Sequence, residues 1–310
     1  FLSILVDPVA YSLELTGAAY CAVSCVDRLD CAFLKQAGFS PVCFLSHAIE
    51  RSLSHPPEAP RPYDIVFLGS CYDHEGLRRS WRDKHGKEKA ALMEEAAERL
   101  YGESGTSIVQ AVFSTWAENG ESLTGLDVKQ LCYDVDYYVR GRDRMELITS
   151  FPNREVHVFG DVQWTTQETA RSWEGALRSF PNVVVHPAVS YAETFEVMKQ
   201  AKVCLNSAPF FKDGTHERIF GGMACGCAVV TSHSHYIEEQ FVHGEEVLLY
   251  EPDLKDLVIP DVEAVLDDDA YRIDLARKGQ NKTHAHHSWD NRAESLLKEL
   301  PPLLKLLPLR

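Results

Sequence analysis

The sequence lacks the features that mark membrane-spanning and nucleic-acid-binding proteins. Its 310 residues contain no apolar run as long as a transmembrane helix, and the short apolar run over residues 1–6 has no basic flank, so it is not a signal peptide. Basic residues are few: 31 Lys and Arg against 46 Asp and Glu, for a formal net charge of −15. Since a phosphate backbone is bound by a basic face, we exclude a nucleic-acid partner, whereas a nucleotide needs only a local positive spot.

Cysteine is present, but not in metal-binding spacing. The nine cysteines are an odd number, and Cys21, Cys25 and Cys31 have no C-x-x-C spacing. Most cysteines lie inside apolar runs, which indicates buried free thiols in a reducing cytosol. We therefore predict a cytoplasmic protein without a cysteine-bound zinc ion.

The apolar pattern predicts two successive α/β units. Residues 1–60 alternate short apolar runs with a helix, and a proline-rich segment at 54–62 predicts a linker. From residue 63 strands and helices alternate, which is typical of a doubly wound sheet. The chain begins on an apolar run without an initiator Met, so we expect part of the first domain to be absent. The predicted domains are residues 1–60, residues 61–292 with a helical insertion at 75–150, and a helical tail at 293–310.

The segment 201–231 is the most informative, because it predicts a strand, a polar loop, a helix, a glycine turn and a second strand. The helix opens after Asp213, Gly214 and Thr215, and its free N–H groups and positive dipole end favour an anion such as a diphosphate. Arg218 lies in the first turn, where the dipole disfavours a cation, so a facing phosphate would explain it. Pairing with a surface carboxylate is the alternative.

Several motifs occur together in the second half of the chain. They are the strands at 156–160, 201–206 and 248–250, the turn at 190–193, the segments 214–218 and 220–226, Thr231, and 287–289 with Arg292. Together they resemble the C-terminal domain of GT-B glycosyltransferases, in particular the spore-maturation CgeB-like branch. Residues 1–70 resemble the later part of that family's N-terminal domain, through residues 6–8 and 64–70.

The resemblance implies a GT-B fold, with two Rossmann-like domains built on parallel sheets, the first one incomplete. It implies a cytoplasmic hexosyltransferase that uses a nucleotide diphosphate sugar and no metal or other cofactor. The donor would bind mainly to the C-terminal domain and an unknown glycan, protein or small-molecule acceptor to the N-terminal one. The expected donor-binding residues are Ser70, Trp164, Asn206, Asp213, Gly214, Thr215, His216, Glu217, Arg218 and Thr231.

Three residues are candidates for catalysis. Asp7 and His47 follow strands on the N-terminal side, where a general base would lie, and His216 would help to stabilise the leaving phosphate. The alternatives remain open: Asp7 forms a turn with Pro8, His47 is a surface histidine, and His216 caps a helix or lies at the surface.

One position departs from the family pattern. Enzymes of this branch often carry E-x7-E, and the second acid usually holds the ribose hydroxyls; here Asp213 is followed at that spacing by Gly221. Glu217 is a substitute, and Gly221→Glu is expected to tighten donor binding. The departure keeps two other interpretations open, a nucleotide-sugar epimerase-like enzyme and a non-catalytic nucleotide-sugar-binding protein.

Two groups of residues suggest a metal site only superficially. Asp134 and Asp136 lie in a helical pattern, where i and i+2 point to different faces, so we assign them to structure. The nearby arginines, Arg140, Arg142 and Arg144, are expected to pair with acids. The histidines lack a third ligand in a matching pattern, so no metal site is predicted; they are His233, His235, His284, His286 and His287.

Overall fold

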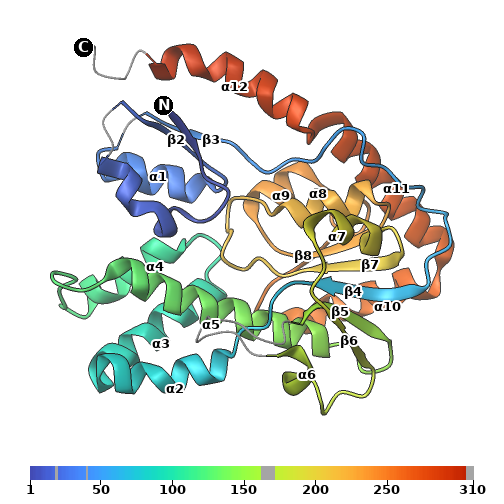
Figure 1. Ribbon diagram of the computed structural model, residues 1–310, viewed down its shortest axis with the longest axis horizontal. Coiled ribbons are helices and arrows are strands. Elements are labelled where there is room, and N and C mark those ends of the chain that lie inside the picture. The colour runs from blue at the N-terminus through green and yellow to red at the C-terminus, as the bar shows by residue number, and fades with distance from the viewer. Residues whose placement is uncertain (18–19, 40, 162–171, 305–310) are drawn as a thin grey trace.

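The computed structural model describes residues 1–17, 20–39, 41–161 and 172–304 and contains two parallel β-sheets (Figure 1). The first sheet has the order β1-β2-β3, from Leu2–Ile4, Ala22–Cys25 and Val42–Phe44. The second has the order β6-β5-β4-β7-β8-β9. Its strands are β4 (Tyr63–Leu68), β5 (Val156–Asp161), β6 (Val183–Pro187), β7 (Ala201–Asn206), β8 (Ala228–Ser232) and β9 (Leu248–Tyr250). The predicted α/β class with parallel sheets is confirmed.

Helices connect and cover these strands. In the first part they are η1 (Val9–Gly17) and α1 (Arg28–Gln36), followed by α2 (His74–His85), α3 (Lys87–Gly102), α4 (Ile108–Glu118) and α5 (Val128–Thr149). The later ones are α6 (Trp173–Ala176), α7 (Tyr191–Met198), α8 (Glu217–Ala224), α9 (His235–Gln240), η2 (Lys255–Leu257), α10 (Ile259–Asp267), α11 (Asp269–His286) and α12 (Trp289–Leu304). None of the described helices has the length and apolar character needed to cross a bilayer.

The inner strands of the second sheet are buried on both faces because they are largely apolar. In β4, Ile65 to Leu68 are almost completely buried, and every residue of β8 is buried. Both strands lie inside the sheet, where helices cover each face (Figure 1). A parallel sheet of this kind presents the carboxyl ends of its strands as a ligand-binding edge.

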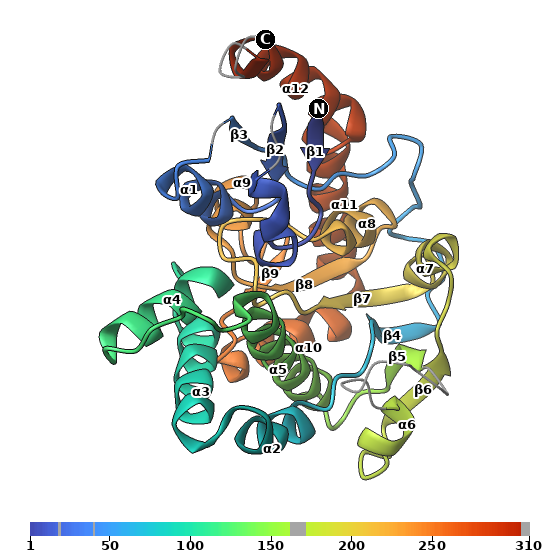
Figure 2. The same ribbon diagram turned by 60° about the vertical axis from the view of Figure 1, so that its left-hand side comes forward.

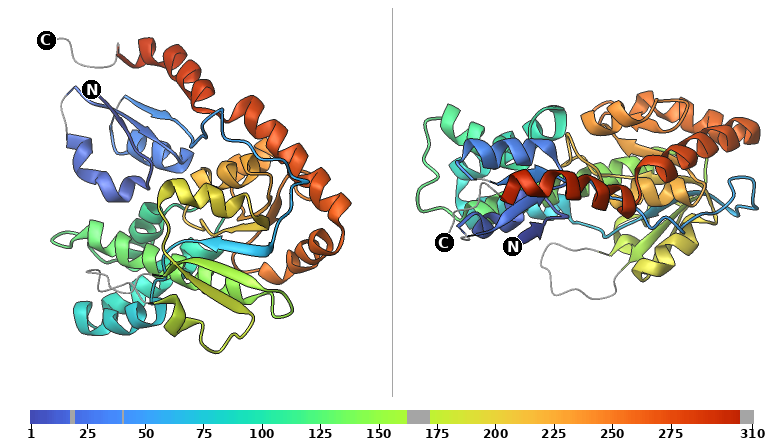
Figure 3. Two further views of the ribbon diagram at one scale, coloured as in Figure 1. Left: turned by 45° about the vertical axis from the view of Figure 1, so that its right-hand side comes forward. Right: turned by 90° about the horizontal axis from the view of Figure 1, so that it is seen from above.

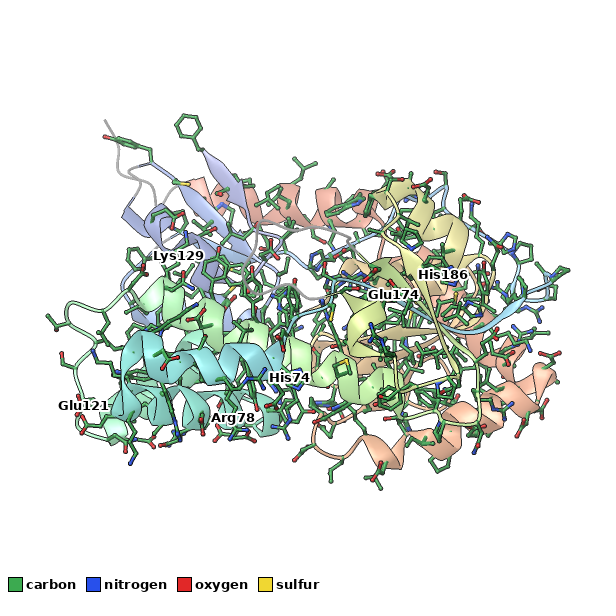
Figure 4. The ribbon with its side chains drawn as sticks, turned by 60° about the horizontal axis from the view of Figure 1, so that its bottom comes forward. His74, Arg78, Glu121, Lys129, Glu174 and His186 are labelled. Atoms are coloured by element: carbon green, nitrogen blue, oxygen red, sulfur yellow. The ribbon has the colours of Figure 1, made fainter. Side chains whose placement is uncertain are left out.

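Helix α5 packs against both parts of the molecule. Figure 2 shows α2–α5 gathered below the first sheet, with α5 beside the second. Leu131 belongs to the same hydrophobic cluster as Val9, whereas Leu147 belongs to the cluster of the second sheet. At the start of α5, Lys129 forms an ion pair with Glu14 of η1 at 3.1 Å (Figure 4). The segment predicted as an insertion of the second domain therefore shares a core with the first 60 residues, because α5 is 22 residues long and apolar at both ends.

Helix α12 ties the end of the chain to its beginning. It runs from α11 back along the first sheet (Figures 1 and 3). The Ile49 N–H donates to the His287 carbonyl, and the Trp289 N–H donates to the Ile49 carbonyl, both at 3.0 Å. Arg292 donates to the carbonyls of Ser46 and His47. These bonds fix the two sheets relative to each other at the strand ends described next.

A buried acid in α1 makes stability depend on pH. Burial and the neighbouring Asp27 raise the pKa of Asp30 to about 8, while the Val9 N–H donates to its Oδ2 at 2.8 Å. The pKa of an unfolded Asp is about 3.9, so the folded protein holds the Asp30 proton more tightly than the unfolded chain does. The free energy of unfolding therefore falls as pH rises from about 4 to about 8. We expect Asp30→Asn to raise Tm more at pH 8 than at pH 5. The exposed Asp83→Asn is the control; an equal effect at both pH values contradicts the assignment.

Candidate functional site

A cavity of about 440 Å³ lies between the two sheets, at the carboxyl ends of β1, β3 and β4 and the start of α8. It brings together six of the residues predicted from sequence, namely Asp7, His47, Ser70, His216, Glu217 and Arg218. The other lining residues are Val6, Gly69, Tyr72, Arg140, Arg144, Tyr191 and Trp289. Residues far apart in the sequence thus meet in one cavity with a strongly basic wall.

Two glycines at adjacent strand ends bring the ends of β4 and β5 close together beside the cavity. Gly160 has a φ of +143°, and a Cβ there would lie 2.2 Å from the Gly69 carbonyl oxygen. The Gly69 carbonyl accepts a hydrogen bond from the indole of Trp173 at 2.7 Å. Only glycine allows this close approach, which places Ser70 at the mouth of the cavity.

His216 caps helix α8 and faces the cavity. The Arg218 N–H donates to its Nδ1 at 3.3 Å, and Oε2 of Glu217 lies 3.2 Å from the same nitrogen. With Nδ1 as the acceptor, the neutral ring carries its proton on Nε2. Burial, followed by the charges of Arg218 and His47, holds the pKa of His216 well below its usual value, so the ring is neutral. The helix-cap alternative is therefore observed, and it leaves an Nε2–H free to act as a donor.

Arg140 and Arg144 form the part of the wall that the sequence interpretation missed. Arg140 does pair with an acid, Asp136 at 2.7 Å, as expected. Arg144 does not: its Nη1 donates to the Ser70 carbonyl at 2.6 Å, and its buried Nε has no hydrogen-bond partner among the described residues. The i, i+4 spacing on one helix was the available signal that the two guanidinium groups share a face.

Two arginines of the basic wall have hydrogen-bonding capacity that their neighbours do not fill. Arg144 is 3% exposed, and burial lowers its pKa to about 10. Burial also lowers the pKa of Arg218, whose Nη1 has no hydrogen-bond partner in the part of the chain that is described. An anion in the cavity would satisfy both N–H groups and relieve the repulsion between the cations.

Asp213 and Gly214, in the loop before α8, contact the first domain and do not line the cavity. Asp213 pairs with Arg28 at 3.4 Å, and its N–H donates to Asp27. The Gly214 N–H donates to Ser234 Oγ at 3.1 Å, and a Cβ on Gly214 would lie 2.4 Å from the Val26 carbonyl oxygen. Asp213 and Gly214 therefore lie outside the cavity lining, where they join the two parts of the molecule.

His47 is held by Thr215 and by the chain after β1. Its Nδ1 lies 2.6 Å from the Thr215 carbonyl oxygen, and its Nε2 lies 3.1 Å from that of Val6. Burial lowers the pKa of His47, and Glu217 opposes this effect from 3.7 Å. Because both nitrogens face carbonyl oxygens, His47 is poorly arranged to accept a proton from a substrate.

Besides Asp213, Gly214 and Thr215, which are absent from the cavity lining, three further predicted donor-binding residues do not line the cavity or cannot be placed. Asn206 and Thr231 are fully buried at the ends of β7 and β8, where the Asn206 amide donates to Thr231 Oγ1 at 2.9 Å. Trp164 lies outside the described residues. His287, named among the histidines, stacks on Phe220 with ring centroids 4.5 Å apart, and its pKa is lowered by burial to about 3, so it belongs to the core.

Two parallel sheets with a basic cavity between them, spanned by a returning C-terminal helix, define the GT-B class of glycosyltransferases. Residues 142–298, half of the chain, match the model of the family described as glycosyl transferase-like. The chain belongs to this family, so the predicted resemblance is confirmed, without specific support for its CgeB-like branch. No curated protein matched the chain.

Solved structures show the same fold. Sucrose-phosphate synthase from Thermosynechococcus elongatus is 14% identical with a TM-score of 0.58, over 98% of this chain and 68% of that one. Anabaena HepE, solved with UDP-glucose, is 12% identical with a TM-score of 0.57, over 97% and 72%. TarM is 10% identical with a TM-score of 0.54, over 95% of this chain but only 45% of that one. At these identities the likeness establishes the GT-B fold.

Gly221 faces a neighbouring helix, which changes what a glutamate there would do. A Cβ on Gly221 would lie 3.0 Å from Phe195 Cε1 and 3.6 Å from Met198 Sδ, both on α7. We expect Gly221→Glu to lower Tm without tightening nucleotide binding, since a carboxylate would enter an apolar contact. The expectation of tighter binding therefore has no geometric support. The control is Gly175→Glu, where a Cβ meets nothing within 4 Å. Tighter binding by Gly221→Glu would refute this argument.

Proposed function

We propose that the chain transfers a sugar from a nucleotide diphosphate sugar to an acceptor, and that Arg144, Arg218 and His216 bind the donor diphosphate. The observation that carries the proposal is the pair of buried guanidinium N–H groups without partners, Arg144 Nε and Arg218 Nη1. A buried donor left unpaired costs about 1–3 kcal/mol, which phosphate oxygens at the cavity wall would offset. The UDP-glucose found in HepE supports a donor of this class.

The cavity supplies what the transfer reaction requires. The bond between the anomeric carbon and the diphosphate oxygen breaks, the acceptor hydroxyl oxygen bonds to that carbon, and the diphosphate leaves with the electron pair. Arg144, Arg218 and the Nε2–H of His216 would stabilise the negative charge that develops on the leaving oxygen. Because these side chains can balance that charge, we propose that transfer needs no metal.

The proton of the acceptor hydroxyl requires a base on the N-terminal side. Asp7 is an exposed carboxylate that lines the cavity, whereas both nitrogens of His47 face carbonyl oxygens. We therefore propose Asp7 as the base and His47 as a residue that positions the Thr215 loop. A cytoplasmic location also remains a proposal, supported by nine free cysteines of which eight are buried.

Release of nucleoside diphosphate tests the proposal. Each nucleotide sugar is incubated with the protein, with and without a pool of sugars, glycans and sugar phosphates. A transferase releases nucleoside diphosphate in the presence of acceptor. Binding without release would instead favour a non-catalytic nucleotide-sugar-binding protein. Conversion of the donor sugar without release would identify an epimerase.

A further inference from the structure

Two histidines and a glutamate outside the cavity form a compact cluster. His233 follows β8, and His235 and Glu238 lie in α9, the short helix that comes next (Figure 1). One ligand atom from each residue lies within 4.8 Å of the others. The cluster borders a separate hollow of about 350 Å³, which is lined also by His243, Glu251 and Asp261. Neither the donor-binding residues nor the family motifs include it.

The distances within this cluster are close to those around a zinc ion. Nε2 of His233 lies 3.2 Å from Oε2 of Glu238, and Nδ1 of His235 lies 4.0 Å from the same oxygen. Tetrahedral zinc with ligands at about 2.0–2.1 Å holds its ligand atoms about 3.3–3.4 Å apart. The first pair already has this spacing, and the second needs a side-chain movement of under about 1 Å.

A second carboxylate orients His233 as a metal ligand. Nδ1 of His233 lies 3.3 Å from Oε1 of Glu251, an ion-pair distance at which the carboxylate favours a proton on Nδ1. The unprotonated Nε2 then faces Glu238 and His235. A carboxylate behind a ligating histidine is the usual outer partner at zinc sites, where it fixes the tautomer.

An ion pair alone accounts for only part of this arrangement. A protonated His233 between Glu238 and Glu251 would explain both of its contacts. His235 lies three residues before Glu238 on α9, and its Nδ1 lies 4.0 Å from the same Glu238 oxygen, beyond hydrogen-bond distance, so it takes no part in this ion pair. A shared cation brings both nitrogens and the carboxylate to one centre.

We propose that His233, His235 and Glu238 bind Zn²⁺, with Glu251 as a positioning residue and water in the fourth position. Two imidazoles and a carboxylate suit zinc better than calcium or magnesium, which prefer oxygen ligands. His235 is 46% exposed on its side chain, so the ion has access from solvent. This site is separate from the proposed donor site and does not depend on its function.

The zinc site has a structural connection to the donor cavity through Ser234. This residue lies between the two histidines, and its Oγ donates to the Gly214 carbonyl at 2.7 Å and accepts from the Gly214 N–H at 3.1 Å. The His235 N–H donates to the Lys212 carbonyl at 2.9 Å. An ion bound by His233 and His235, the neighbours of Ser234, therefore fixes the loop that leads to His216 and Arg218.

Zinc titration of the full chain tests the site. The protein is stripped with a chelator and titrated with Zn²⁺ against a chromophoric competitor, and with Co²⁺ as a spectroscopic probe. We expect one equivalent with tetrahedral cobalt absorption, lost in His235→Ala and in His233→Ala/His235→Ala. Glu251→Gln should weaken binding about 10–100-fold. The matched control is His243→Ala, which removes a histidine of the same hollow that pairs with Asp261 at 3.3 Å and should leave the equivalent intact.

Two results would overturn the proposal. The first is wild-type protein that binds no zinc. The second is a His233→Ala/His235→Ala variant that binds zinc with unchanged affinity. Either result would show that His233 forms ion pairs with Glu238 and Glu251 and does not bind a metal. The coupling to the cavity is tested separately by amide hydrogen exchange. Zinc should slow exchange over residues 212–217 in the wild type and not in His235→Ala, and binding without this protection would refute the coupling.

Discussion

Replacing Arg144 and Arg218, each of which carries one unpartnered N–H group, is expected to abolish nucleotide binding while leaving the fold intact. Removal of one charge-assisted contact to a diphosphate costs about 1.5–3 kcal/mol, so Arg144→Ala or Arg218→Ala alone should weaken binding about 10–100-fold. The double variant should lose more binding free energy than either single variant. The two losses should not be strictly additive, because the two side chains share one ligand and line the same cavity wall. Calorimetric titration with the nucleoside diphosphate measures the effect.

The effect on stability separates a binding role from a structural one. Both guanidinium groups are desolvated next to other cations, and their unpartnered N–H groups cost stability in the absence of nucleotide. We therefore expect Tm of the double variant to be equal to or higher than that of the wild type. Arg79→Ala is the control, since Arg79 is 68% exposed on α2. Unchanged nucleotide affinity, or a large fall in Tm, would show that the arginines are structural.

Gly214→Ala is expected to damage both stability and the cavity. The new methyl group would lie 2.4 Å from the Val26 carbonyl oxygen and 2.9 Å from Asp27 Cα. The backbone at Gly214 or at Val26 and Asp27 must therefore move. Overpacking of this kind costs about 1–3 kcal/mol of unfolding free energy. Because Gly214 lies directly before Thr215 and His216, the shift should also displace the basic wall and weaken nucleotide binding at least about tenfold.

A glycine with open space around it provides the matched control. A Cβ on Gly105 meets nothing within 4 Å, so Gly105→Ala should leave Tm and affinity near their wild-type values. Thermal unfolding and nucleotide titration of both variants check the argument. If Gly214→Ala behaved like Gly105→Ala, the close contact between the loop and the first domain would not exist in solution.

The strands of the second sheet could be predicted because they are largely apolar runs with polar residues at their ends. Segment 201–231 is one example: its predicted strand, loop, helix and strand are observed as β7, a loop, α8 and β8. His216 and Arg218 were located by the same reasoning, because residues at a helix start are near neighbours in sequence. Sequence pattern is sufficient to predict a feature when the residues that form it are close together in the sequence.

The remaining features depend on contacts between distant segments. Arg144 was expected to pair with an acid, but it reaches the cavity because α5 lies beside the residues that follow β4, where Arg144 donates to the Ser70 carbonyl. Gly214 was expected to bind phosphate, yet it lies against Val26, more than 180 residues earlier. The sharing of a core by α5 and the first sheet likewise depends on tertiary packing that no periodicity encodes.

The most direct test of the central claim is a thermal-shift panel with UDP, GDP, TDP, CDP and ADP and their common sugars, run on the wild type and on Arg144→Ala/Arg218→Ala. A ligand that binds only the folded state raises Tm, so we expect a clear rise for one nucleotide in the wild type and none in the double variant. A wild type that shows no rise with any of them, or an equal rise in both proteins, would contradict the proposal that this basic cavity binds a nucleotide-sugar donor.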